Sequence, residues 1–142
     1  MQARSPILGQ TKIHIESADG RSLFLADAFE NARIQRLTLG QGDLRPLAGI
    51  PRVRYGTSWE VTREGIYYVE AGSPQAAIGY FEFATDSTRE LARLSHQIVP
   101  WTGLSVSPVD RSVLYSQTDE KSSEIMLAEF GNGVPSRAGT PP

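Results

Sequence analysis

Apolar residues along the chain alternate with polar ones or gather in short runs, and Gly, Pro, Asp and Ser interrupt these runs. Alternation with a period of two is typical of strands with one buried face, whereas an amphipathic helix needs apolar residues at i, i+3, i+4 and i+7. No long stretch keeps the helical spacing. The segment that comes nearest to it, Thr88 to Ser95, suits one helical turn or a strand. The pattern therefore predicts an all-β protein.

The alternating pattern repeats along the chain. Ser17-Ala-Asp-Gly-Arg-Ser-Leu-Phe-Leu-Ala26 aligns without gaps on Ser107-Pro-Val-Asp-Arg-Ser-Val-Leu-Tyr-Ser116, and Thr62-Arg-Glu-Gly-Ile-Tyr-Tyr-Val69 is a shorter version. The apolar runs begin at Leu23, Ile66 and Val113, which are 43 and 47 residues apart. Periods of about 40–50 residues with several short strands per unit indicate the blades of a β-propeller. One blade cannot bury both of its faces alone, so neighbouring blades must stack.

Each repeat divides into short antiparallel strands, ideally four to a blade. The expected strands are Lys12–Glu16, Ser22–Ala26, Arg33–Leu39 and Leu44–Ala48; then Ser58–Val61, Gly65–Glu70, Ala77–Phe83 and Glu90–Leu94; and then Gly103–Val106, Ser112–Ser116 and Ser123–Glu129. The third unit lacks a fourth strand, because the segment that follows is rich in Gly, Pro and Ser. Pro6-Ile-Leu-Gly9 is similar to Pro46-Leu-Ala-Gly49, which ends the first unit, so we expect the missing outer strand at the N-terminal end.

These strands predict one half-propeller of about three blades over residues 1–130. Its expected parts are an outer strand at 6–9, blade one at 11–49, blade two at 57–95, blade three at 102–130 and a flexible tail at 131–142.

The turns Ser17-Ala-Asp-Gly20 and Ser107-Pro-Val-Asp110, each followed by Arg-Ser and an apolar strand, resemble those of the WD40-like, or TolB-like, β-propeller repeat family. The family's turn typically reads Ser-Pro-Asp-Gly before Arg or Lys. Residues 103–130 are similar to the last blade of propellers in large bacterial proteins. The resemblance covers roughly residues 6–130 and implies a propeller fold, but it implies little about function because propellers host many unrelated activities.

The turns depart from the family's pattern. Ala18 stands where the family has Pro, and in the third repeat Val109 and Asp110 stand where Asp and Gly are expected. The middle repeat, at Thr62 to Gly65, keeps only the Gly. Because such a turn needs residues that tolerate a tight conformation, we expect drifted turns rather than lost strands.

The expected number of blades differs more strongly from the family's pattern. Propellers of this family usually have six or more blades, and three flat blades cannot close a ring. Two interpretations remain open. Either the chain is the C-terminal half of a larger propeller, or two copies join as a six-bladed homodimer in which each copy contributes its first strand to the other. We favour the homodimer, which also covers open sheet edges that would otherwise promote aggregation.

Composition and charge narrow the classes of partner. The chain has 142 residues, 14 Lys plus Arg and 16 Asp plus Glu, so its formal charge is −2. That balance gives no general reason to bind nucleic acid or an anionic membrane, and no apolar run is long enough for a membrane span or a signal peptide. The absence of cysteine excludes disulfides, thiolate nucleophiles and Cys-ligated zinc.

Residues that could support catalysis are few. The two histidines are His14 and His96. His14 stands between two isoleucines of an alternating strand, so it faces away from them, toward solvent or a channel. There is no Gly-x-Ser-x-Gly or Ser-x-x-Lys motif, no calcium-loop pattern in the acidic segment 119–124, and no helix after Gly40-Gln-Gly42 to bind phosphate. We expect no catalytic residues, metal site or cofactor, and a hydrolase or lyase using His14 is the least favoured alternative.

Arginine and aromatic residues favour binding. Of the basic residues, 12 are Arg, and Arg with aromatic neighbours suits anion contact, stacking and protein interfaces. The two loops expected beside the propeller channel are Gly49–Ser58 and Ser95–Gly103. The candidate ligand-binding residues are Arg52, Arg54, Tyr55, Trp59, His96 and Trp101, with His14 from the first strand. The alternative is that the two tryptophans pack between blades.

We therefore expect a non-enzymatic module that binds a protein or a small ligand at one face or in the central channel. The alternative is a structural or assembly half-propeller with no ligand of its own.

Overall fold

The computed structural model describes residues 12–71, 75–100, 102–118 and 123–130, and within these ranges the chain forms strands and no helix. Every strand pairing is antiparallel. The prediction of an all-β protein is confirmed. The expected outer strand at 6–9, Trp101 and the tail at 131–142 lie outside the described residues.

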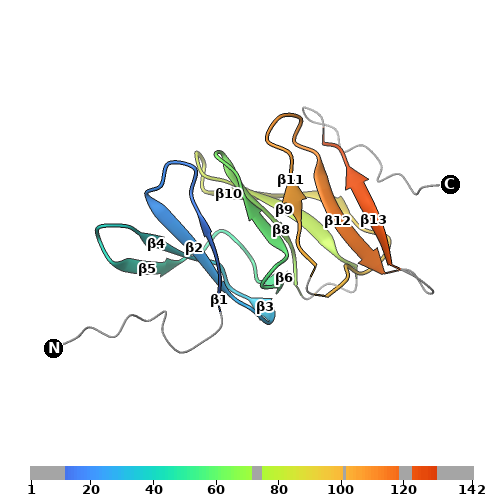
Figure 1. Ribbon diagram of the computed structural model, residues 1–142, viewed down its shortest axis with the longest axis horizontal. Coiled ribbons are helices and arrows are strands. Elements are labelled where there is room, and N and C mark those ends of the chain that lie inside the picture. The colour runs from blue at the N-terminus through green and yellow to red at the C-terminus, as the bar shows by residue number, and fades with distance from the viewer. Residues whose placement is uncertain (1–11, 72–74, 101, 119–122, 131–142) are drawn as a thin grey trace.

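Three sheets stand side by side and match the three sequence repeats (Figure 1). The first sheet has the order β1-β2-β4-β5, with β1 (Lys12–Glu16), β2 (Ser22–Asp27), β4 (Gln35–Thr38) and β5 (Asp43–Pro46). The second contains β7 (Trp59–Val61), β8 (Gly65–Val69), β9 (Ala77–Glu82) and β10 (Ser87–Arg93). The third contains β11 (Ser105–Val106), β12 (Val113–Thr118) and β13 (Ser123–Ala128). The expected strands are present with small shifts of their ends, and the ambiguous segment from Thr88 is a strand.

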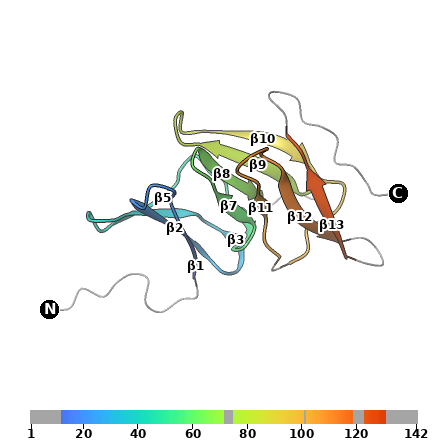
Figure 2. The same cartoon turned by 45° about the horizontal axis from the view of Figure 1, so that its top comes forward.

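The first strands of the sheets lie toward the middle of the molecule, where β7 contacts both β1 and β11 (Figure 2). Each of these strands pairs by its last residue with the residue that begins an apolar run. The pairs are Glu16 with Leu23, Val61 with Ile66, and Val106 with Val113. The sequence alignment is therefore also a structural one. Residues at the same register position in different sheets are called equivalent below.

Neighbouring sheets bury their facing surfaces in two apolar cores. The first core joins Phe24, Ala26 and Ile34 of the first repeat to Trp59, Ile66, Tyr68 and Phe81 of the second. The second core joins Tyr67, Val69, Ile78 and Tyr80 to Val113, Tyr115, Met126 and Ala128 of the third. Burial of apolar surface between sheets is thus what holds consecutive repeats together.

Two short strands were not predicted. β3 (Glu30–Ala32) pairs with β6 (Val53–Tyr55), so the expectation that Gly49–Ser58 is a loop is wrong over β6. Its Val53 and Tyr55 are buried, and Val53 also forms a bridge with Glu70 of the second repeat. The connection between the second and third repeats also pairs with the repeat that follows it, because Ile98 forms a bridge with Gln117. Connecting segments therefore add hydrogen bonds between consecutive repeats.

Candidate functional site

The predicted binding residues of the first connection make structural contacts. Arg52 Nη1 donates a hydrogen bond to the carbonyl of Asn31 at 3.0 Å, and the Arg54 guanidinium lies 5.9 Å from the centre of the Tyr55 ring. Tyr55 itself is buried, with 6% of its surface exposed. These contacts hold β6 in place and leave Arg52 as the most exposed of the three residues.

Trp59 lies in the first core and is 2% exposed. Its indole Nε1 donates to the carbonyl of Gly56 at 2.6 Å, so the one polar atom of the side chain is satisfied. The structure thus places Trp59 between sheets, as the alternative interpretation of the tryptophans expects.

The two histidines lie on different elements. His14 is exposed on β1. His96 is half-buried after β10, and its Nδ1 lies 3.0 Å from Ser95 Oγ and 3.4 Å from Gln117 Nε2. Within the described ranges, no three His, Asp or Glu side chains gather as a metal site would require, and no helix could cross a membrane.

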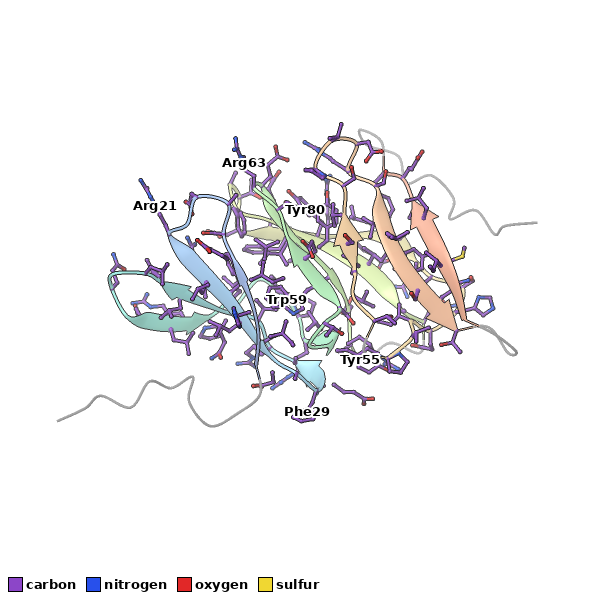
Figure 3. The ribbon with its side chains drawn as sticks, viewed as in Figure 1. Arg21, Phe29, Tyr55, Trp59, Arg63 and Tyr80 are labelled. Carbon is purple, nitrogen blue, oxygen red and sulfur yellow. The ribbon has the colours of Figure 1, made fainter. Side chains whose placement is uncertain are left out.

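The turns that follow β1, β7 and β11 lie at the end of the molecule opposite to Tyr55 (Figure 3). In the first turn Asp19 Oδ1 accepts hydrogen bonds from Ser17 Oγ at 2.6 Å and from the Arg21 amide at 3.0 Å. In the third, Asp110 Oδ1 accepts from the Ser112 amide at 3.1 Å. Hydrogen bonds to a carboxylate favour its charged form, so the bonds from Ser17 and Arg21 lower the pKa of Asp19. Those from the Ser107 side chain, and then from the Ser112 side chain and amide, lower the pKa of Asp110 to about 2.

A groove of about 410 Å³ opens at this end between the first and second sheets. Phe24 and Phe83 both line it, and their rings stack with centres 5.5 Å apart. The Arg36 guanidinium lies 5.8 Å from the Phe24 ring centre, while its Nε donates to Ser22 Oγ at 3.0 Å. We call this the first groove; it combines an aromatic surface with cationic and hydroxyl groups.

A second groove of about 450 Å³ lies between the second and third sheets. It is lined by Tyr67, whose ring centre is 4.7 Å from that of Tyr80, and by the exposed Val109. Arg111 and Glu64, which also line it, form a 3.0 Å ion pair that joins the two repeats. Both volumes are in the range of about 300–1,000 Å³ that is common for ligand sites.

Thr62 and Arg63 line both grooves. Thr62 is fixed by exchange of hydrogen bonds with Gly65, at 3.0 and 3.2 Å. Arg63 is exposed, and it has no hydrogen-bond or charged partner among the residues that the structure describes. The grooves therefore share one guanidinium that is free to bind.

Arg63 is close in sequence to the candidate residues Tyr55 and Trp59, but the structure places it at the other end of the molecule from Tyr55 (Figure 3). Figure 3 shows Arg63 at the same end as Arg21, whereas Tyr55 lies at the other end beside Phe29. The reason is that β7 (Trp59–Val61) carries the chain from one end of its sheet to the other. Sequence reasoning missed the part played by Phe24, Phe83 and Arg36, whose proximity depends on the stacking of sheets.

The fold is similar to that of a solved structure, TolB from Acinetobacter baumannii, with a TM-score of 0.65 and 16% sequence identity. The match covers 92% of this chain and 33% of that one, so the chain spans about a third of the length of that protein. No protein-family model and no curated protein matches the sequence. The chain therefore has a TolB-like, β-propeller-type fold, and its sheets are consistent with propeller blades.

Proposed function

We propose that the chain is a non-enzymatic β-propeller module that binds a protein partner through the two grooves around Arg63. The observation that carries the proposal is that two neighbouring grooves share an exposed guanidinium without a partner in the described part of the chain. Arg is enriched at the centres of protein interfaces, as are aromatic residues.

The partner that suits these grooves is an extended peptide segment with acidic side chains. The charges beside Arg63 are largely neutralised within the protein, since Glu64 pairs with Arg111 and Asp19 accepts hydrogen bonds within its own turn. A carboxylate from a partner would form a charge-assisted hydrogen bond with Arg63. Apolar side chains of the same segment would contact Phe83, the partly exposed ring of the stacked pair, on one side and the exposed Val109 on the other.

The positions of the histidines support a function without catalysis. A general base needs a partner group that orients it and a nearby reacting site. Among the described residues, His96 contacts Ser95 and Gln117 rather than a carboxylate, and His14 is on another sheet.

We further propose that each sheet is one blade, that the chain contributes three blades, and that a second copy completes a six-bladed ring. That number lies within the range of about 4–8 blades that close propellers. The stacked cores and the equivalent register of the three sheets support this organisation.

Binding of immobilised peptides tests the proposed function. The probe is an array of extended 12-residue peptides in matched pairs, acidic in one member and basic in the other. We expect acidic members to bind and Arg63→Gln to weaken that binding about tenfold, the effect of losing about 1.4 kcal/mol. Arg45→Gln is the matched control, because Arg45 is an exposed arginine paired with Asp43 and lines neither groove. Equal binding of both members, or binding unchanged by Arg63→Gln, would contradict the proposal.

A further inference from the structure

The third sheet has an apolar face that no other sheet covers within the part of the chain that the structure describes. Along β12 the exposed residues alternate with buried ones, and the exposed side carries Leu114. Leu127 pairs directly with Leu114 and Ile125 pairs with Ser116, so Leu127 and Ile125 lie on the same face. Their exposed fractions are 44% for Leu114, 52% for Leu127 and 72% for Ile125. We call these three residues the trailing face.

The register shows what normally covers such a face. Ile125 is equivalent to Ile34 of the first repeat and Ile78 of the second, which are 1% and 0% exposed. Leu114 and Leu127 are equivalent to Tyr67 and Tyr80. In the second repeat all three residues are buried against the third sheet. In the first repeat Phe24 and Ile34 are buried against the second sheet, whereas Arg36, the equivalent of Leu127, is exposed. The trailing face therefore has the chemistry and the position of a surface that receives another sheet.

The first sheet carries a complementary row of partly exposed leucines on its other side. Leu23, Leu37 and Leu44 form a row of directly paired residues across β2, β4 and β5. Leu23 and Leu37 are equivalent to Ile66 and Phe81, which are buried against the preceding sheet. In the first sheet these leucines are only half-buried. We call Leu23, Leu37 and Leu44 the leading face.

We infer that the trailing face of one copy binds the leading face of a second copy, and that the reverse contact forms at the same time. Each face is equivalent to one side of the two sheet-to-sheet contacts inside the chain, so a first sheet is the occupant that fits a third sheet. The two sheets are at opposite ends of the row in one chain (Figures 1 and 2), so the contact joins different chains. A twofold axis then makes both contacts identical and closes the assembly.

This inference rests on the ring proposed above and names the residues that close it. It differs from a back-to-back dimer, in which two trailing faces would meet and two leading faces would remain open. It also differs from strand exchange alone, because side chains rather than backbone hydrogen bonds form the contact.

Cysteine cross-linking distinguishes these arrangements, and the chain has no cysteine of its own to interfere. Full-length Leu127→Cys and Leu37→Cys chains are each treated with a short bismaleimide, separately and after mixing and equilibration. We expect a cross-linked dimer in the mixture and none from either variant alone. A cross-linked dimer from Leu127→Cys alone, or no product from the mixture, would overturn the inference.

A mass measurement on Ile125→Arg gives an independent test. We expect this variant to be a folded monomer, because an arginine in the dry centre of the contact has no partner. Phe29→Arg is the matched control, since Phe29 is 65% exposed but lies on neither face, and it should remain a dimer. A dimeric Ile125→Arg would overturn the inference. Acidic-peptide binding by monomeric Ile125→Arg separates the two proposals, since the grooves lie within one chain.

Discussion

At the scale of single residues, the turns after β1 and β11 reach the same hydrogen bonding from different sequences. Both turns close with an amide-to-carbonyl bond, from Ser17 to Ser22 at 2.9 Å and from Ser107 to Ser112 at 2.8 Å. The residue with positive φ follows the aspartate in each, Gly20 in the first and Arg111 in the third. The aspartate has therefore moved by one position while keeping its function, which explains why the third turn departs from the Asp-Gly pattern.

These aspartates make a pH dependence predictable. The folded-state pKa of Asp110 is about 2 against an ordinary 3.8, and that of Asp19 is also lowered. Because a lowered pKa stabilises the fold above the unfolded-state value, this contribution is present above pH 3.8 and is lost as the pH falls through about 2. We expect Asp110→Asn to be less stable than the wild type near neutral pH and to lose less stability over that acid range. Urea unfolding across the range measures both, and an Asp110 pKa at its ordinary value by NMR would contradict the account.

Two buried tyrosines should respond in opposite ways to loss of their hydroxyl. The Tyr115 hydroxyl is buried with no hydrogen-bond partner in the described structure, whereas the Tyr68 hydroxyl bonds the Thr88 side chain. We expect Tyr115→Phe to leave the free energy of unfolding unchanged or higher, and Tyr68→Phe to lower it by about 1 kcal/mol. Chemical denaturation of the pair measures this difference. A clear loss of stability in Tyr115→Phe would show that its hydroxyl is satisfied in solution.

At the scale of elements, the alternation of apolar residues predicted every strand of the three sheets. It missed β3 and β6, which have three residues each and are held by pairing with each other. Segments this short give too little alternation to distinguish them from loops. The one signal that the sequence offered was the apolar pair Val53 and Tyr55 on either side of Arg54.

The second sheet departs from the other two at Gly79, and this predicts a packing constraint. Gly79 is equivalent to Gln35 and Met126, and it pairs with Tyr68. A Cβ at Gly79 would collide with the Tyr68 ring. We expect Gly79→Ala to lower the free energy of unfolding by about 1–3 kcal/mol through overpacking.

Tyr68→Leu provides the matched partner, because the equivalent residue of the first sheet is Leu25. In a double-mutant cycle, the combined variant should be more stable than the sum of the single losses predicts, by about 0.5–3 kcal/mol. Additive losses measured by urea unfolding would mean that the ring and the glycine do not constrain each other.

At the scale of the whole molecule, the sequence predicted the class of fold but not the candidate site. Equivalent residues recur at fixed spacing, so the repeat is visible in one dimension. The grooves, in contrast, form between side chains of different sheets, such as Phe24 and Phe83, whose separation along the chain is long. Residues close in sequence, such as Tyr55 and Arg63, end on opposite sides of the molecule (Figure 3).

In the proposed ring, the chain is an arc of three blades that a second copy closes. Each of its two end faces carries leucines at positions that are buried inside the row of sheets, and about 25 cal/mol per Å² of apolar burial favours covering them. The oligomeric state of the chain in solution therefore tests the closure of the ring more directly than any single substitution.

That state is measured by light scattering coupled to gel filtration, over a range of protein concentrations. The account predicts a single species of twice the 15.6 kDa chain mass. A stable monomer at all concentrations, with the trailing face left open, would contradict it.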